Sequence, residues 1–124
     1  MKTSGLGVDG ERFAKEYLEA AGYRILEQNF ISRFGEIDII ATSERFLCFV
    51  EVKTRSSSLN LATGFESISP QKQQRIIKSA EYYLATHARQ VEKAGLQPRF
   101  DCMEINVDGK DVNIRMIENA FCLE

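Results

Sequence analysis

The chain has 124 residues, of which 44% are hydrophobic and 27% charged, and 18 acidic against 16 basic side chains give a net charge of −2. These values are those of an ordinary globular protein and exclude disordered, collagen-like and coiled-coil chains. The length predicts a single domain over residues 1–124. No apolar run approaches the roughly 20 residues that cross a bilayer, so we expect a cytoplasmic protein that does not bind membranes.

Cysteine and histidine are too scarce for several common kinds of site. Cys48, Cys102 and Cys122 are widely spaced without a Cys-x-x-Cys pair, and His87 is the only histidine. A disulfide scaffold and a zinc site of cysteine and histidine ligands are therefore not expected. A catalytic site in this chain would have to be built from carboxylates.

The first half of the chain predicts one helix and three strands. Apolar residues at helical spacing predict a helix over residues 9–21, with Asp9 as its N-cap and Gly22 as its left-handed stop. Strands are expected over residues 23–30, 35–42 and 46–54. The third is apolar on both faces, which is typical of a central strand.

The second half predicts a helix and a hairpin. Ser69-Pro70, a cap followed by proline at the first helical position, begins a helix that is expected to continue to Gly95. Strands over residues 99–107 and 111–117 flank Asp108-Gly109, a strong hairpin signal. The order αβββαββ predicts an α/β fold, a mixed five-stranded sheet flanked by helices, because a helix between two strands implies a parallel crossover.

Charged residues occupy strand positions where the pattern requires core. Side chains alternate along a strand, so Glu51 and Lys53 share a face with the apolar side chains before them and end a buried row. Burying a carboxylate costs several kcal/mol unless a cation compensates, and a divalent metal held by two carboxylates is a common solution. Asp38, on the neighbouring strand, is the candidate second ligand.

A purely structural explanation exists for the same residues. Glu51 and Lys53 would then pair with each other at the strand end, and Asp38 would be exposed. The acid-x-lysine triplet is weak by itself, because Asp108-Gly109-Lys110 also fits it and has a full explanation as a tight turn. The strand context separates the two triplets.

Residues along most of the chain resemble the YraN family of small, largely uncharacterised bacterial proteins. The matching residues are Gly10-Glu11, Tyr17-Leu18, Gly22-Tyr23, Ile25-Leu26, Asn29, Gly35-Glu36-Ile37-Asp38, Phe49-Val50-Glu51-Val52-Lys53-Thr54-Arg55, Lys72, Ala80, Tyr83-Leu84 and Arg99-Phe100-Asp101. That family resembles the restriction-endonuclease-like PD-(D/E)xK nucleases, especially archaeal Holliday-junction resolvases. The resemblance implies a restriction-endonuclease-like core.

The resemblance also assigns roles by position. Asp38 matches the aspartate of the motif, Glu51 its second acid, Lys53 its lysine and Glu11 the glutamate of the first helix, so Asp38, Glu51 and Lys53 are the implied catalytic residues. Ile37 replaces the proline of the motif, which has no catalytic atom. An acid in the first turn of a helix is also favoured by the helix dipole, which gives Glu11 an alternative structural role.

The implied reaction is phosphodiester hydrolysis. Asp38, Glu51 and Glu11, with the carbonyl of Val52, would hold Mg²⁺ or Mn²⁺, which polarises the scissile phosphate and lowers the pKa of a bound water. Lys53 would orient or deprotonate that water, or stabilise the negative charge that develops on the phosphate.

Basic residues after the motif are candidates for binding nucleic acid. Lys72, Arg75 and Lys78 share one side of the second predicted helix, and Arg55 precedes them, so these cations could follow a phosphate backbone. The alternative is that they form an ordinary solvated helix face. Gln73 is predicted to point toward the strand ends and help position the lysine or a phosphate.

Two further residues of the pattern have a simpler interpretation. Arg99 and Asp101 are expected to form a pair that fixes loop ends.

The sequence therefore predicts a Mg²⁺-dependent endonuclease that acts on branched or structured DNA. Resolving a junction requires paired cuts, so such an enzyme is expected to be a homodimer. The alternative is a non-catalytic module that binds nucleic acid or protein and retains the nuclease fold.

Overall fold

A computed structural model describes residues 4–56 and 68–121 of the chain. Its centre is a mixed five-stranded sheet in which strand order follows chain order. The strands are β1 (Arg24–Ser32), β2 (Gly35–Ser43), β3 (Phe46–Ser56), β4 (Gln97–Asp108) and β5 (Asp111–Phe121). β3 and β4 are parallel, and the other neighbouring pairs are antiparallel. The predicted α/β fold with a mixed sheet is confirmed.

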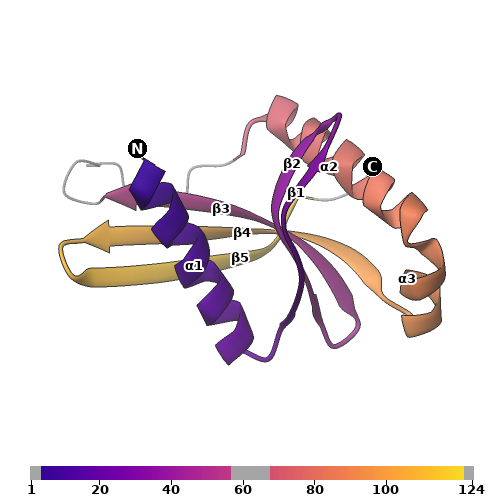
Figure 1. Ribbon diagram of the computed structural model, residues 1–124, viewed down its shortest axis with the longest axis horizontal. Coiled ribbons are helices and arrows are strands. Elements are labelled where there is room, and N and C mark those ends of the chain that lie inside the picture. Colours follow the sequence, from indigo (N-terminus) through magenta and orange to yellow (C-terminus); the bar gives the residue numbers. More distant parts are fainter. Residues whose placement is uncertain (1–3, 57–67, 122–124) are drawn as a thin grey trace.

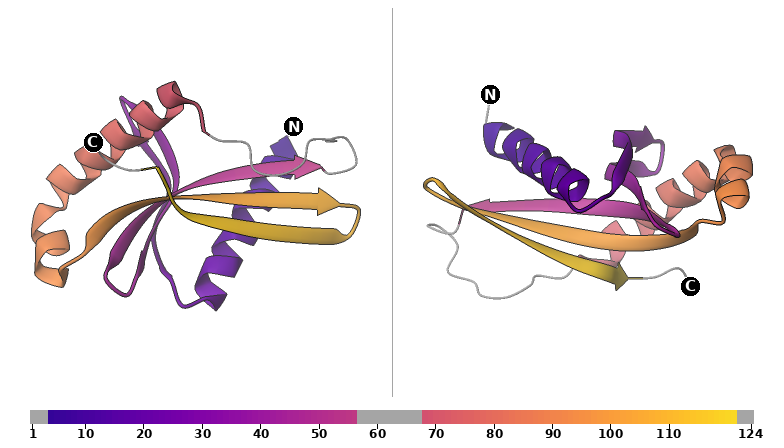
Figure 2. Two further views of the ribbon diagram at one scale, coloured as in Figure 1. Left: turned by 180° about the vertical axis from the view of Figure 1, so that it is seen from behind. Right: turned by 90° about the horizontal axis from the view of Figure 1, so that it is seen from below.

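The sheet is strongly twisted, and helices cover both of its faces. In Figure 1 the strands cross near the middle of the molecule and spread apart on both sides of the crossing. The helices are α1 (Ser4–Ala20), α2 (Pro70–Thr86) and α3 (Ala88–Ala94). Figure 2 shows α1 on one side of the long strands, while α2 and α3 form the crossover between β3 and β4. Within the described residues, no helix is long and apolar enough to span a bilayer.

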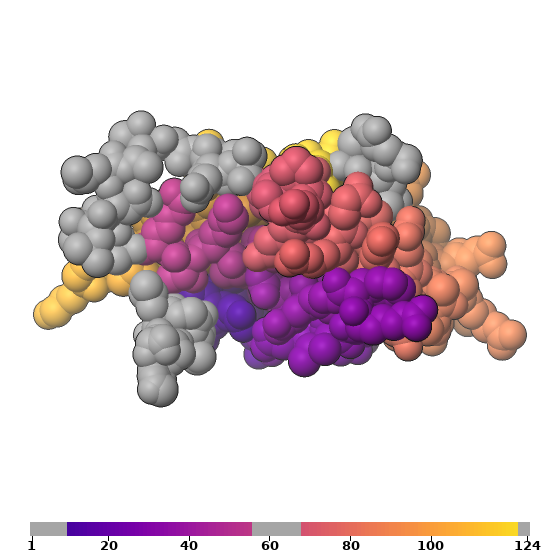
Figure 3. Space-filling view, turned by 90° about the horizontal axis from the view of Figure 1, so that it is seen from above, coloured from indigo at the N-terminus to yellow at the C-terminus, as the bar shows by residue number. Residues whose placement is uncertain are grey.

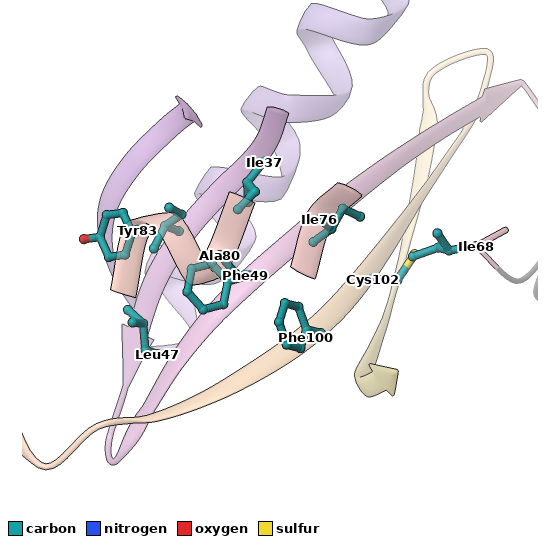
Figure 4. Packing of buried hydrophobic residues seen from close by; sticks show 10 residues of the cluster. Ile37, Leu47, Phe49, Ile68, Ile76, Ala80, Tyr83, Phe100 and Cys102 are labelled. Atoms are coloured by element: carbon teal, nitrogen blue, oxygen red, sulfur yellow. The ribbon is translucent and has the colours of Figure 1, made fainter. Parts of the chain in front are cut away.

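Alternate residues of β3 enter two separate hydrophobic layers. Cys48 and Val50 pack in the layer under α1, whereas Leu47 and Phe49 pack in the layer under α2. This two-sided burial is why β3 is apolar on both faces and central, as predicted. The α2 layer, drawn in Figure 4, contains Ile37, Ile40, Leu47, Phe49, Ile68, Ile76, Ala80, Tyr83, Phe100 and Cys102.

The first helix begins earlier than the sequence predicts. α1 starts at Ser4, so Asp9 lies inside the helix and the prediction that it is the N-cap is wrong. The predicted stop is confirmed, because Gly22 has a φ of 96° just after the helix ends.

The predicted second helix is two helices. Ser69 caps α2 through its side chain, and Pro70 is the first helical residue, as expected. The helix is interrupted at His87, whose backbone is not helical. The Thr86 hydroxyl donates to the carbonyls of Tyr82 and Tyr83, and the His87 imidazole contacts the Tyr83 carbonyl. The His87 N–H still donates to the Tyr83 carbonyl, but the φ of −125° at His87 ends α2. A new helix, α3, then starts at Ala88 and stops before Gly95, which is in the left-handed conformation.

The β4–β5 hairpin forms where Asp108-Gly109 predicts it. Asp108 pairs with Asp111 across a two-residue turn, and Gly109 has a φ of 63°. Both strands are longer than predicted, and β5 extends to Phe121, whose ring stacks on Phe100 with centroids 5.0 Å apart. The sheet therefore ends in a paired strand that also closes the α2 layer.

Candidate active site

Asp38 of β2 and Glu51 of β3 are neighbours across an antiparallel ladder. Ile39 pairs with Val50, so the next position on each strand brings Asp38 opposite Glu51. The two carboxylates line a pocket of about 160 Å³, together with Gly35, Glu36, Lys72, Arg75 and Ile76. Figure 3 shows the face where the start of α2, the β1–β2 hairpin and the end of β3 meet, with part of α1 between them.

Asp38 is held by the backbone of β3. Its Oδ2 accepts a hydrogen bond of 2.8 Å from the Val52 N–H. Burial and the nearby charge of Glu51 nevertheless raise its pKa to about 7, while the Val52 hydrogen bond and Lys72 act in the opposite direction. The structural alternative of an exposed Asp38 is therefore wrong: this carboxyl group is largely removed from water and lacks sufficient positive charge nearby.

Glu51 is more deeply buried than Asp38 and has a cationic partner from α2. The residue is 6% exposed, and its Oε2 lies 2.5 Å from the Lys72 Nζ. Burial disfavours the charge of Lys72, but the hydrogen bond and the charge of Glu51 outweigh it and raise the Lys72 pKa. Lys72 therefore places a positive charge beside the buried carboxylate of Glu51.

Glu11 reaches the same region from α1. Gly10 allows the close approach of this helix to β3, because a Cβ at position 10 would lie 1.8 Å from the Thr54 Oγ1. Burial raises the pKa of Glu11, a hydrogen bond from Asn29 opposes this, and the charges of Glu36 and Glu51 add to the increase. The sequence alone assigned no role to Glu36, a further acid at this site, or to Asn29, whose amide contacts both Glu11 and Glu36.

Lys53 and Arg55 continue the face of β3 that carries Glu51. Lys53 is half-buried two residues after Glu51, and its charge favours a lower pKa of the Cys102 thiol against the effect of burial. Arg55 Nη2 lies 3.9 Å from Oε2 of the buried Glu104. A row of charged side chains therefore extends from the pocket along β3.

The residues of the second helix that were predicted to contact nucleic acid lie at two different places. Lys72 and Arg75 line the carboxylate pocket, whereas Gln73 and Lys78 line a separate depression of about 570 Å³ beside the end of β5. Gln73 does not point into the carboxylate pocket, because its amide donates to the Ile68 carbonyl at 2.8 Å and fixes the start of α2.

Arg99 and Asp101 form a separate polar centre on the α1 side of the sheet. Asp101 is fully buried and receives the Arg99 guanidinium at 3.0 Å, together with the Asn119 N–H at 2.8 Å. Arg99 also donates to the Tyr23 hydroxyl at 2.9 Å and lies over the Phe46 ring. These contacts join the starts of β1 and β4 to the end of β5, in agreement with the expected structural role.

The donor set of the pocket suits a hard divalent cation. Carboxylate oxygens are the preferred ligands of Mg²⁺ and Mn²⁺, and Glu36, Asp38 and Glu51 all line this pocket. In the described part of the chain, no three His, Cys, Asp or Glu side chains converge as they stand in a metal-binding cluster. A metal would therefore have to draw the carboxylates together and displace Lys72 from Glu51.

Comparison with known proteins establishes the family. The family model for the uncharacterised protein family UPF0102 matches residues 10–105. The chain belongs to the UPF0102 family. A UPF0102 protein of Chlorobium limicola is 48% identical over 106 residues, which cover 86% of this chain and 78% of that protein. Those of Caldicellulosiruptor bescii and Persephonella marina are 43% and 45% identical, covering 98% and 95% of this chain and 100% and 94% of theirs.

The UPF0102 match confirms the YraN-type family predicted from the sequence. The matched stretch runs from the Gly10 contact in α1 to β4, so it contains Glu11, Asp38, Glu51 and Lys53. The candidate site of this UPF0102 protein is therefore built from the part of the chain that defines the family.

Proposed function

We propose that this UPF0102 protein is a metal-dependent nuclease that hydrolyses phosphodiester bonds in branched or structured DNA. The observation that carries the proposal is the Asp38–Glu51 pair, a half-buried and a buried carboxylate on adjacent strands, in which burial first and the charge of Glu51 second raise the pKa of Asp38 to about 7. Strongly perturbed acids in a pocket are candidates for functional groups. Lys53, two residues along the same face, completes an acid–acid–lysine set.

The residues of the site would have different roles in this reaction. Asp38 and Glu51, with Glu11 from α1, would hold Mg²⁺ or Mn²⁺, and the Val52 N–H keeps the Asp38 carboxylate oriented. When bound, the metal supplies polarisation of the phosphate and a lowered pKa for water. Lys53 orients or deprotonates the attacking water, or stabilises the charge on the phosphate.

The basic residues at the pocket would contact the substrate. Lys72 and Arg75 line its wall, and Lys72 would be released from Glu51 when the metal neutralises that carboxylate. A DNA phosphate at the pocket would then meet two cations from one helix. Arg55 and Lys78 lie farther along β3 and α2 and would contact the flanking backbone.

One observation favours the non-catalytic alternative. The ion pair between Lys72 and Glu51 neutralises an acid that a nuclease would need for its metal. A binding module that retains the fold would keep this ion pair when its partner binds. The activity assay below separates the two functions.

The test is cleavage of labelled duplex, flap, single-stranded and four-way-junction DNA with Mg²⁺ or Mn²⁺. We expect metal-dependent cleavage by the wild type and a loss of more than about 100-fold in Asp38→Asn and Lys53→Met, each shown to be folded. The matched controls are Asp108→Asn and Lys110→Met, because Asp108-Gly109-Lys110 has the same spacing on an exposed turn. Both controls should retain full activity.

Two results would contradict the proposal. Cleavage that persists in Asp38→Asn would point to a contaminating nuclease. No cleavage of any substrate by folded wild type with either metal would favour the binding module instead.

A further inference from the structure

Asn29 has a backbone conformation that is unusual inside a strand. Its φ is 53°, in the left-handed region, although it lies in the middle of β1. Gln28 pairs with Ile39 and Phe30 with Ile37, so Asn29 lies across the ladder from Asp38. Left-handed residues other than glycine cost energy and often mark functional positions.

The side chain of Asn29 bridges two acids from different elements. Its amide nitrogen lies 3.1 Å from Oε1 of Glu11 on α1 and 2.9 Å from Oε2 of Glu36 on β2. Both neighbours are acceptors, so the nitrogen and not the oxygen must face them. Asn29 therefore uses both of its amide hydrogens to hold two like charges side by side.

We propose that Asn29 is a positioning residue of the metal site, whose amide fixes Glu11 against Glu36 so that the Glu11 carboxylate faces the Asp38–Glu51 pair. This inference rests on the proposed function. Without the amide, Glu11 and Glu36 would repel each other, and Glu11, on a helix that is not part of the sheet, would lose its hydrogen bond to β1. Groups that orient metal ligands are commonly worth ten- to a hundredfold in metal affinity.

Because Asn29 has a left-handed backbone, its side chain can be removed without changing the backbone conformation. Asn29→Gly removes the amide but keeps the conformation, since glycine adopts a positive φ without strain. Asn119→Gly is the matched control, because Asn119 has a φ of 55° and its backbone N–H, which glycine retains, binds Asp101 away from the pocket. Melting temperatures of both variants in EDTA verify that they are folded.

The readout is the dissociation constant for Mn²⁺, measured by calorimetry or electron paramagnetic resonance without nucleic acid. We expect Asn29→Gly to bind Mn²⁺ about tenfold more weakly than the wild type and Asn119→Gly to bind it within about twofold. In a Glu11→Gln background, adding Asn29→Gly should change the affinity by less than about twofold, because the ligand that Asn29 positions is already lost.

Three results would overturn this inference. Wild-type affinity in Asn29→Gly would show that Asn29 only shapes the strand. An undiminished effect in the Glu11→Gln background would show that Asn29 acts through another group. A wild type that does not bind Mn²⁺ would remove the proposed metal site as well, and so would be distinguished from the other two.

Discussion

Two aspartates of the same sheet have opposite electrostatic surroundings. Asp101 is fully buried, yet Arg99, itself 11% exposed, and a backbone N–H satisfy it. Asp38 is less buried, but it is subject to the charges of Glu51 on β3 and Glu11 on α1, which the charge of Lys72 opposes only in part. Where this fold buries an acid for stability, it provides a planar, bidentate cation. At Asp38, where no such cation is provided, binding of a proton or of a cationic ligand is favoured.

The largest effect is expected at the satisfied aspartate. Arg99→Met would leave Asp101 buried without its cation and should lower the free energy of unfolding by about 3–5 kcal/mol. The control is Arg115→Met, because the Arg115 side chain is 54% exposed and 3.9 Å from Glu104, and it should cost less than about 1 kcal/mol. Urea denaturation measures both. Equal losses would show that the Arg99–Asp101 pair is no stronger than a surface contact.

Substitution of Asp38 is expected to raise the free energy of unfolding rather than lower it. Its folded pKa of about 7 lies above its ordinary value of 3.8, so the folded protein binds a proton more tightly than the unfolded chain. Protonated Asp38 therefore contributes fully to the free energy of unfolding below about pH 4, and this contribution is lost as the pH rises through 7. Asp38→Asn should unfold like wild type near pH 4 and be about 4 kcal/mol more stable at pH 8 in EDTA. Destabilisation at pH 8 would contradict the account.

The smallest effect is expected at the exposed cation. The Lys72 side chain is 47% exposed but its partner Glu51 is 7% exposed, so Lys72→Met should cost about 1–2 kcal/mol at low ionic strength, less than Arg99→Met. The loss should shrink in 1 M NaCl, because salt screens the half-exposed ammonium group of the pair. Urea denaturation at both salt concentrations tests this. A loss as large as that of Arg99→Met would place Lys72 in the same structural class as Arg99.

Local signals were enough to predict most of the fold. The alternation of β3, the Ser69-Pro70 start of α2 and the Asp108-Gly109 turn depend on neighbouring residues and are confirmed. The break at His87 was missed because it is a change of backbone angles at one residue, and the apolar spacing continues through it. Periodicity reports which face is apolar, but not whether the helix is continuous.

Only the residues of the site that lie on adjacent strands could be predicted from the sequence. Asp38 and Glu51 follow from two adjacent strands with charges in core positions, and the structure brings them together. Lys72 was assigned to an exposed phosphate-binding face, because a helical angle does not show which strand end lies beneath it. Asn29 has no local signature, since its role depends on α1 docking through Gly10 and on a left-handed backbone inside β1.

The most direct test of the central claim is the melting temperature of wild type and Asp38→Asn at pH 8, in EDTA and with increasing Mn²⁺. The account predicts that Asp38→Asn melts higher than wild type in EDTA, and that Mn²⁺ raises the wild-type melting temperature with concentration but leaves Asp38→Asn nearly unchanged. An equal Mn²⁺ response in both proteins, or none in the wild type, would contradict the claim that Asp38 and Glu51 form a metal site.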